Sequence, residues 1–147
     1  MLGDLATFGG LFLTAFAAAT VLPLQSEAAL VGFLLAGTHS PAALVLAATI
    51  GNVLGSVVNW LLGRRIDCFC DRKWFPIKPA ALDRAAARYH RYGRWSLLLS
   101  WAPFIGDPLT VMAGVLREPL WSFIAIVTVA KAGRYLAVAA LTLGLYL

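Results

Sequence analysis

Two short motifs place a carboxylate four residues after a proline inside apolar sequence, at Pro23–Glu27 and at Pro103–Asp107. Proline removes a backbone donor and breaks a helix, so each motif predicts a break in its apolar segment. A carboxylate at membrane depth is costly unless it is hydrated, paired or protonated. An acid held at such a break can take up and release a proton. We therefore predict that Glu27 and Asp107 exchange protons and contact a transported substrate.

Two cations, Lys131 and Arg134, lie inside the last apolar segment of the chain. They are three residues apart and therefore share one face of a helix. Charges in such a segment are expensive, so we expect them to pair with Glu27 or Asp107, or to face water. Two interpretations stay open. The cations form structural ion pairs, or they bind the anionic group of a substrate.

The composition requires a membrane around these charges. Hydrophobic residues make up 61% of the 147 residues and charged residues 13%, whereas soluble domains have about 45–50% and about 25%. A chain of this length forms one domain. It is too short to bury so much apolar surface in water, and we predict an integral membrane protein.

The order of apolar and polar segments predicts an all-α membrane protein with one domain, 1–147. Its expected parts are a re-entrant helix hairpin (1–38), a spanning helix (42–62), a basic loop (63–94), a second re-entrant hairpin (95–116) and a spanning helix (119–147). The hairpins are expected to break at Pro23 and at Pro103, Gly106 and Pro108. With one span between them, the hairpins enter from opposite sides, as in an inverted repeat. Paired broken segments point to a transport site at the midplane.

The first spanning segment carries a polar stripe, Asn52, Ser56 and Asn59, beside Gly51 and Gly55. Polar groups at this depth face the interior of a helix bundle. Asn52 and Asn59 either bond to neighbouring helices or line the path of a substrate. The glycines allow another helix to approach closely. That helix belongs either to this chain or to a second copy in a homo-oligomer.

The loop 63–94 holds nine basic and three acidic residues, a net charge of +6, while the rest of the chain carries −1. A basic patch is also typical of nucleic-acid binding. A single basic loop between apolar segments instead follows the positive-inside rule. We predict a cytoplasmic loop and no nucleic-acid partner.

Within this loop, Pro79–Tyr92 is predicted to form an amphipathic helix that ends at Gly93. One face carries apolar residues and the opposite face carries arginines: Leu82, Ala86 and Tyr89, and Arg84, Arg88 and Arg91 respectively. Such a helix lies on an anionic leaflet. A surface that recruits lipid headgroups has the same pattern.

No arrangement typical of an enzyme is present in the sequence. Cys68 and Cys70 form a lone C-x-C without further ligands, so neither a metal nor a cofactor is expected. His39 falls in a short turn and His90 on the amphipathic helix, and neither has an evident partner in the sequence. Catalysis requires positioned partners, so we do not predict an enzyme.

Several motifs along nearly the whole chain resemble the DedA family, also called SNARE-associated or VTT-domain proteins, and within it the short YqaA-like branch. They are Pro23-x-x-x-Glu27-Ala-Ala-Leu, Gly51-Asn-x-x-Gly55 leading to Gly63-Arg64, Arg91-Tyr-Gly-Arg94, Trp101-Ala-Pro103-x-x-Gly106-Asp107-Pro108, and Ala113-Gly114. The resemblance implies two opposed re-entrant hairpins in a bacterial inner membrane. It also implies translocation of phospholipid or polyprenyl-phosphate lipid, often coupled to protons.

The chain departs from the wider family at the second hairpin. Typical members carry arginines three residues before and three after its proline, where this chain has Ser100 and Gly106. The acid usual in the first full helix is replaced at about Ser56. Phosphate binding by that arginine pair is therefore not carried over. We expect Lys131 and Arg134 to supply the positive charge instead.

The sequence thus predicts a multi-pass inner-membrane flippase or scramblase whose partners are an anionic lipid headgroup and protons. Two alternatives remain. One is a small proton- or ion-coupled transporter, or a membrane-homeostasis factor, without a lipid cargo. The other is a structural membrane subunit, in which neutralising the buried charges leaves function intact.

Overall fold

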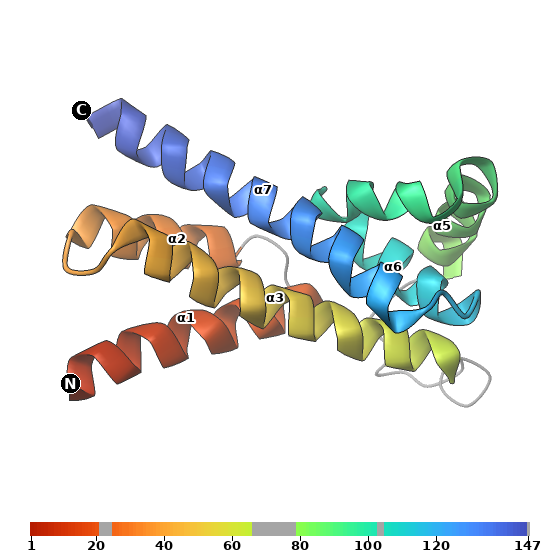
Figure 1. Cartoon of the computed structure of the whole chain (residues 1–147), viewed down its shortest axis with the longest axis horizontal. Coiled ribbons are helices and arrows are strands. Elements are labelled where there is room, and N and C mark those ends of the chain that lie inside the picture. The colour runs from red at the N-terminus through yellow and green to blue at the C-terminus, as the bar shows by residue number, and fades with distance from the viewer. Residues whose placement is uncertain (21–24, 66–78, 103–104, 147) are drawn as a thin grey trace.

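The computed structural model describes residues 1–20, 25–65, 79–102 and 105–146. Every regular element among these residues is a helix (Figure 1). The elements in chain order are α1 (Leu2–Thr20), α2 (Gln25–Ala36), α3 (Pro41–Arg64), α5 (Pro79–Tyr92), the 3₁₀ helix η1 (Gly93–Trp101), α6 (Gly106–Val115) and α7 (Leu120–Tyr146). The described part of the chain is therefore all-α, as the sequence predicts.

Two long helices, α3 and α7, form the centre of the molecule and contact each other. Both are long and apolar enough to cross a membrane. Pro41 opens α3 at its first turn, where its missing N–H costs nothing. In Figure 1 α3 and α7 run in opposite directions, lie close together near α6 and diverge toward the end that holds both chain termini. Each therefore reaches both ends of the structure.

The shorter helices gather at the two ends of this central pair (Figure 1). Helices α1 and α2 contact each other and α3, and α2 also contacts α7. Helices α5, η1 and α6 gather at the other end, where α6 packs on α3 and η1 packs on α7. The chain thus places one pair of short helices, α1–α2, opposite another, η1–α6.

Two apolar clusters follow from this division. One joins α1, α2, the first half of α3 and the second half of α7 through Leu11, Leu30, Leu44 and Tyr135. The other joins α5, η1, α6, the second half of α3 and the first half of α7. Each cluster uses only half of each long helix. The stretch of each long helix between the two clusters can therefore carry side chains of another kind.

The glycines of α3 permit its close packing inside the chain. A Cβ at Gly51 would overlap the carbonyl oxygen of Phe12 in α1. At the other end, a Cβ at Gly63 would overlap the carbonyl oxygen of Val111, and one at Gly114 that of Trp60. Such small residues let helix backbones touch. Of the two interpretations of this face, the contact within the chain is the one that the structure contains.

The predicted chain breaks are only partly visible. Pro23 and Pro103 lie outside the described residues, as do Cys68 and Cys70. Gly106 begins α6, and Pro108 lies in its first turn, where a proline is tolerated. The segment before it, η1, is a 3₁₀ helix rather than an α-helix. The arms of two helix pairs are thus described, while their re-entrant character remains a prediction.

Helix α5 spans the residues predicted for the amphipathic helix, and Gly93 follows it with a φ of 63°. A positive φ is easily adopted only by glycine, which ends the helix. Ala85 and Tyr89 form the buried positions of α5. The hydroxyl of Tyr89 donates to Glu118 Oε2 at 2.6 Å. Burial, and next this bond, raises the pKa of Tyr89, so the phenol stays protonated and donates at neutral pH.

The structure gives His39 partners that the sequence does not show. Its Nε2 lies 2.9 Å from Asp4 Oδ1 and its Nδ1 2.8 Å from the hydroxyl of Thr38. Its ring also packs edge-on against Phe8. Asp4 and His39 are 35 residues apart in the chain, so only the folded arrangement of α1 beside the α2–α3 turn reveals the contact.

Candidate functional site

The charged residues singled out in the sequence meet near the middle of the molecule. Glu27 lies in the first turn of α2 and Asp107 in the first turn of α6. Lys131 and Arg134 lie on adjacent turns of α7, between its contacts with the two apolar clusters. One helix from each short pair therefore presents its first turn, and its acid, to the same stretch of α7.

Arg134 pairs with Glu27. Its Nε donates a hydrogen bond to Glu27 Oε1. The Arg134 side chain is 9% exposed and the Glu27 side chain 25% exposed. A charge-assisted bond in such surroundings is stronger than one in water, because less solvent screens it. This contact joins α2 to α7.

Lys131 lies opposite Asp107, at a greater distance. Its Nζ is 3.9 Å from Asp107 Oδ1, beyond hydrogen-bonding range, and the Lys131 side chain is only 3% exposed. At this separation the attraction is Coulombic and strong only because the site is shielded from water. Of the two arrangements expected for the cations, pairing with the acids or facing water, the structure contains the pairing. The two pairs differ, since one is hydrogen-bonded and the other is open.

A chain of hydrogen bonds lies beside the Glu27–Arg134 pair. The side-chain amide of Asn52 donates to the hydroxyl of Tyr135 at 2.9 Å and to the carbonyl of Ala15 at 3.2 Å. Tyr135 in turn donates to the hydroxyl of Ser26 at 2.9 Å. Asn52 therefore joins α3 to α1 and α7, and Tyr135 extends the chain of bonds to α2. Asn52 Oδ1 has no hydrogen-bond partner among the described residues.

Asn59 has a corresponding place near the second pair. Its amide donates to the hydroxyl of Thr110 at 3.2 Å, and Thr110 donates to the backbone carbonyl of Asp107 at 2.7 Å. Asn52 and Asn59 are two helical turns apart on one face of α3. Each is linked through one hydroxyl, that of Tyr135 or that of Thr110, to the first turn of a short helix that carries an acid. Ser56 lies between them and bonds back to the carbonyl of Asn52.

Together these residues form a polar belt between the two apolar clusters. The belt contains Ser26, Glu27, Asn52, Ser56, Asn59, Asp107, Thr110, Lys131, Arg134 and Tyr135. It can hold protons on two carboxylates and attract an anion with two cations.

Sequence reasoning did not identify several members of this arrangement. Ser26 and Tyr135 were not selected, although Tyr135 lies four residues after Lys131 and hence on the same helical face. That spacing was the available signal for Tyr135. Thr110 is three residues after Asp107 and had a similar signal. Ser26 has none, because a single serine beside a break is common in any sequence.

Glu118 was also missed, and it lies outside the polar belt at the α6–α7 corner. Besides Tyr89, it contacts Ser122 at 2.9 Å and Arg94 Nε at 3.4 Å, and its backbone carbonyl accepts from Trp60 Nε1. Its carboxylate therefore fastens α5 and η1 to α7. This role is structural.

The two positions at which the chain departs from the wider family touch each other. A Cβ on Gly106 would overlap the backbone carbonyl of Ser100, so no larger residue fits at Gly106 with this backbone. Ser100 itself is buried. The structure thus explains why an arginine is absent at Gly106, and the cations near the acids come from α7 instead.

The fold and the belt define a class: an integral membrane protein, all-α in its described residues, with two buried cations on one long helix that pair with acids of two short helices. The chain belongs to the VTT domain family, which matches residues 3–143. It is 42% identical over 134 residues to the inner membrane protein YqaA of Escherichia coli K12, covering 90% of this chain and 88% of that one. An uncharacterized protein of Haemophilus influenzae is 34% identical over 134 residues, 86% and 82% of the two chains. No solved structure matches significantly.

These similarities identify the membrane in which the protein resides. With a relative named as an inner membrane protein and two helices of spanning length and hydropathy, the chain is a protein of the inner membrane. The family recognised from the sequence motifs is confirmed.

Proposed function

We propose that the protein moves an anionic lipid, a phospholipid or a polyprenyl phosphate, between the leaflets of the inner membrane, with proton exchange at Glu27 and Asp107. The observation that carries this proposal is the arrangement of the belt. Two acids from opposite helix pairs meet two cations on adjacent turns of one long helix. A single buried ion pair would be sufficient if its role were stability alone. The second pair and the partial exposure of both carboxylates are therefore not explained by stability.

The pairs suggest how an anion and a proton exchange. When Glu27 is ionised, its carboxylate occupies Arg134, and an anionic headgroup would have to displace it. When Glu27 takes up a proton, Arg134 is released and attracts a phosphate in place of the carboxylate. The same exchange applies to Asp107 and Lys131. Charge in the belt is then conserved during each swap, which avoids leaving an unpaired charge at membrane depth.

The path would run beside Asn52 and Asn59, which lie near the two pairs and offer amide groups to a passing headgroup. The membrane topology in this proposal is the predicted one. The helix pairs α1–α2 and η1–α6 enter from opposite leaflets, and the loop 63–94 is cytoplasmic. The acids of their second arms then lie at the level where the two pairs meet.

Reconstitution tests the proposal. Purified protein in liposomes is given labelled phospholipid or labelled polyprenyl phosphate, and movement between leaflets is followed by quenching from outside, with and without a pH gradient. We expect Glu27→Gln and Asp107→Asn each to slow movement at least tenfold. Asp83→Asn, which removes an exposed carboxylate on α5, is the matched control and should match the parent.

Two results would contradict the proposal. Movement unchanged in both belt variants would remove the carboxylates from the mechanism. If the parent moves neither lipid, the cargo is wrong.

The near-complete enclosure of Lys131 favours a second candidate, a small proton- or ion-coupled transporter without lipid cargo. A side chain that is 3% exposed is easily reached by a proton or a small ion, but hardly by a headgroup. A vesicle pH change on adding a soluble ion, without lipid movement, would select this alternative. Full function after neutralising Glu27, Asp107 and Lys131 together would select a structural subunit.

A further inference from the structure

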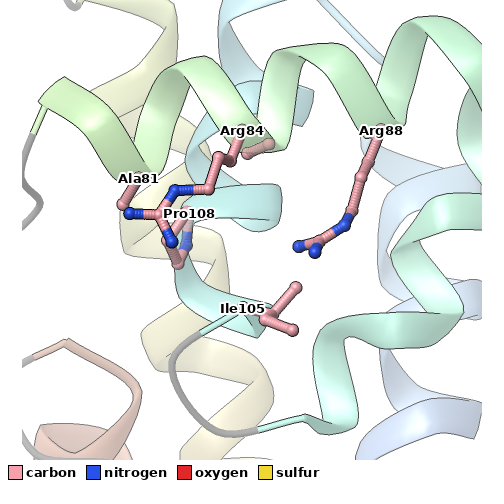
Figure 2. Close-up of a pocket in the computed structure, with 6 residues that line it drawn as sticks. Ala81, Arg84, Arg88, Ile105 and Pro108 are labelled. Atoms are coloured by element: carbon pink, nitrogen blue, oxygen red, sulfur yellow. The ribbon is translucent and has the colours of Figure 1, made fainter.

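A small cavity lies between the amphipathic helix α5 and the start of α6, apart from the polar belt. Its volume is about 120 Å³, and it is lined by Ala81, Arg84, Ala85, Arg88, Ile105 and Pro108. Figure 2 shows Arg84 and Arg88 extending from α5 toward Pro108 and Ile105, with both guanidinium groups directed into this space. The sequence placed both arginines on an outward face opposite the apolar one. The structure instead turns them toward α6.

Within the described part of the chain, neither arginine forms an ion pair. The exposed Asp83 makes no salt bridge with them, and Asp107, next to Pro108, is opposite Lys131 on α7. Two guanidinium groups that line one cavity repel each other, and none of the acids in the described residues offsets this repulsion. A bound anion removes that repulsion, and guanidinium groups match the geometry of phosphate oxygens.

The neighbouring surface indicates that this anion belongs to a lipid. A larger open groove of about 760 Å³ shares Arg88 with the cavity and continues over Trp95, Leu98 and Leu99. These three apolar side chains are 67%, 39% and 37% exposed. The cavity is smaller than the roughly 300–1,000 Å³ of a site for a whole small molecule, so it fits a headgroup without its chains. The groove provides an apolar surface for a chain attached to that headgroup.

We infer that Arg84 and Arg88 form a docking site for a phosphate-bearing lipid headgroup, with the acyl or prenyl chain along the groove of Trp95, Leu98 and Leu99. The site lies on the amphipathic helix, where a lipid in the cytoplasmic leaflet would reach it before the belt. It is thus an entrance to the proposed path and rests on the proposed function, although binding there is measured separately from transport.

Lipid binding by the detergent-purified full chain tests this inference. Native mass spectrometry measures the bound fraction during titration with short-chain phosphatidic acid or with the matching phosphatidylcholine. We expect phosphatidic acid to bind at least tenfold more tightly than phosphatidylcholine. Arg84→Gln with Arg88→Gln should abolish this preference, and each single change should reduce it. Arg117→Gln removes the same charge from the exposed turn between α6 and α7, outside both the cavity and the groove, and should leave the preference within twofold.

A competition arm distinguishes the source of the phosphate. If inorganic phosphate displaces phosphatidic acid at equal concentration, the site binds free phosphate and the lipid assignment is wrong. An equal loss in Arg117→Gln and in the double variant would show general attraction to positive charge and overturn the site. Equal melting temperatures of the parent and the variants ensure that any loss is one of binding.

The assay also separates this inference from the proposed function. Glu27→Gln should keep the preference for phosphatidic acid while losing transport. Loss of the preference in the arginine double variant with unchanged transport would reject the entrance site alone. Preserved binding with no transport by the parent would reject the proposed function alone.

Discussion

At the scale of residues, the polar belt contains charges whose stability depends on their partners. Arg134 bonds to Glu27, and both side chains are largely shielded from solvent. Removing one member of a buried pair leaves the other charge uncompensated, whereas removing both leaves none. The stability of the pair can therefore be tested independently of transport.

We predict that Arg134→Gln lowers the free energy of unfolding by about 3–5 kcal/mol, because it leaves the Glu27 carboxylate unpaired. The double variant Glu27→Gln with Arg134→Gln should recover more than half of this loss. Thermal melting in detergent, followed by intrinsic fluorescence, measures both. A double variant as unstable as the single one would mean that the loss arises from packing around Arg134.

Tyr135 links Asn52 to Ser26 through one hydroxyl and is 1% exposed. Tyr135→Phe should cost roughly 1–3 kcal/mol, because the Asn52 amide and the Ser26 hydroxyl each lose a buried partner. Tyr92→Phe is the matched control, since Tyr92 is 53% exposed, and it should change stability little. Equal melting temperatures for both variants would show that the hydrogen-bond chain contributes no stability.

At the scale of elements, close contact between α3 and α6 holds the second helix pair in place. The contact consists of Gly63 against the backbone of α6 and of Gly114 against the backbone of α3. Glu118, at the corner between α6 and α7, also holds α5 in place through its hydrogen bond from Tyr89. An added methyl group at either glycine must separate the two helices.

Gly63→Ala should therefore destabilise the protein by about 1–3 kcal/mol, the usual cost of overpacking. Gly32→Ala in α2 is the control, because a Cβ there meets nothing within 4 Å. Without a contact to disturb, it should leave stability unchanged or raise it by up to about 1 kcal/mol through helix propensity. Melting temperatures of the two variants are compared with the parent. A stable Gly63→Ala would contradict backbone contact at this crossing.

At the scale of the whole molecule, we expect the two ends of the structure to lie on the two sides of the membrane. The α2–α3 turn lies at the end occupied by α1 and α2, and α5 lies at the other (Figure 1). Helix α5 is part of the basic loop 63–94, so the positive-inside rule predicts that α5 lies on the cytoplasmic side. Thr38 in the turn is then outside.

Single cysteines test this orientation after Cys68 and Cys70 are replaced by serine. Cysteine at Thr38 should react with an impermeant maleimide in intact cells. Cysteine at Arg91 in α5, or at Arg72 in the basic loop outside the described residues, should react only after permeabilisation. Labelling of Thr38 and Arg91 from the same side would refute the opposed arrangement of the two helix pairs.

The sequence alone determined the class, the family and the charges of interest. An apolar composition and the cost of charge at membrane depth were sufficient to select Glu27, Asp107, Lys131 and Arg134. The 3.6-residue period and glycine chemistry located α5 from Pro79 to Tyr92. These inferences depend on the spacing of residues along the chain or on the free energy of transferring a side chain from water into the membrane. Both follow from the sequence itself.

Only the tertiary structure decided which groups meet. The sequence left Arg134 with two possible acids and did not identify Tyr135, Ser26 or Glu118. Contacts between residues as far apart as Ser26 and Tyr135, 109 positions in the chain, depend on how α2, α3 and α7 pack. The direction of Arg84 and Arg88 toward α6 was likewise decided by packing, because helical periodicity fixes which residues share a face but not which neighbour that face meets.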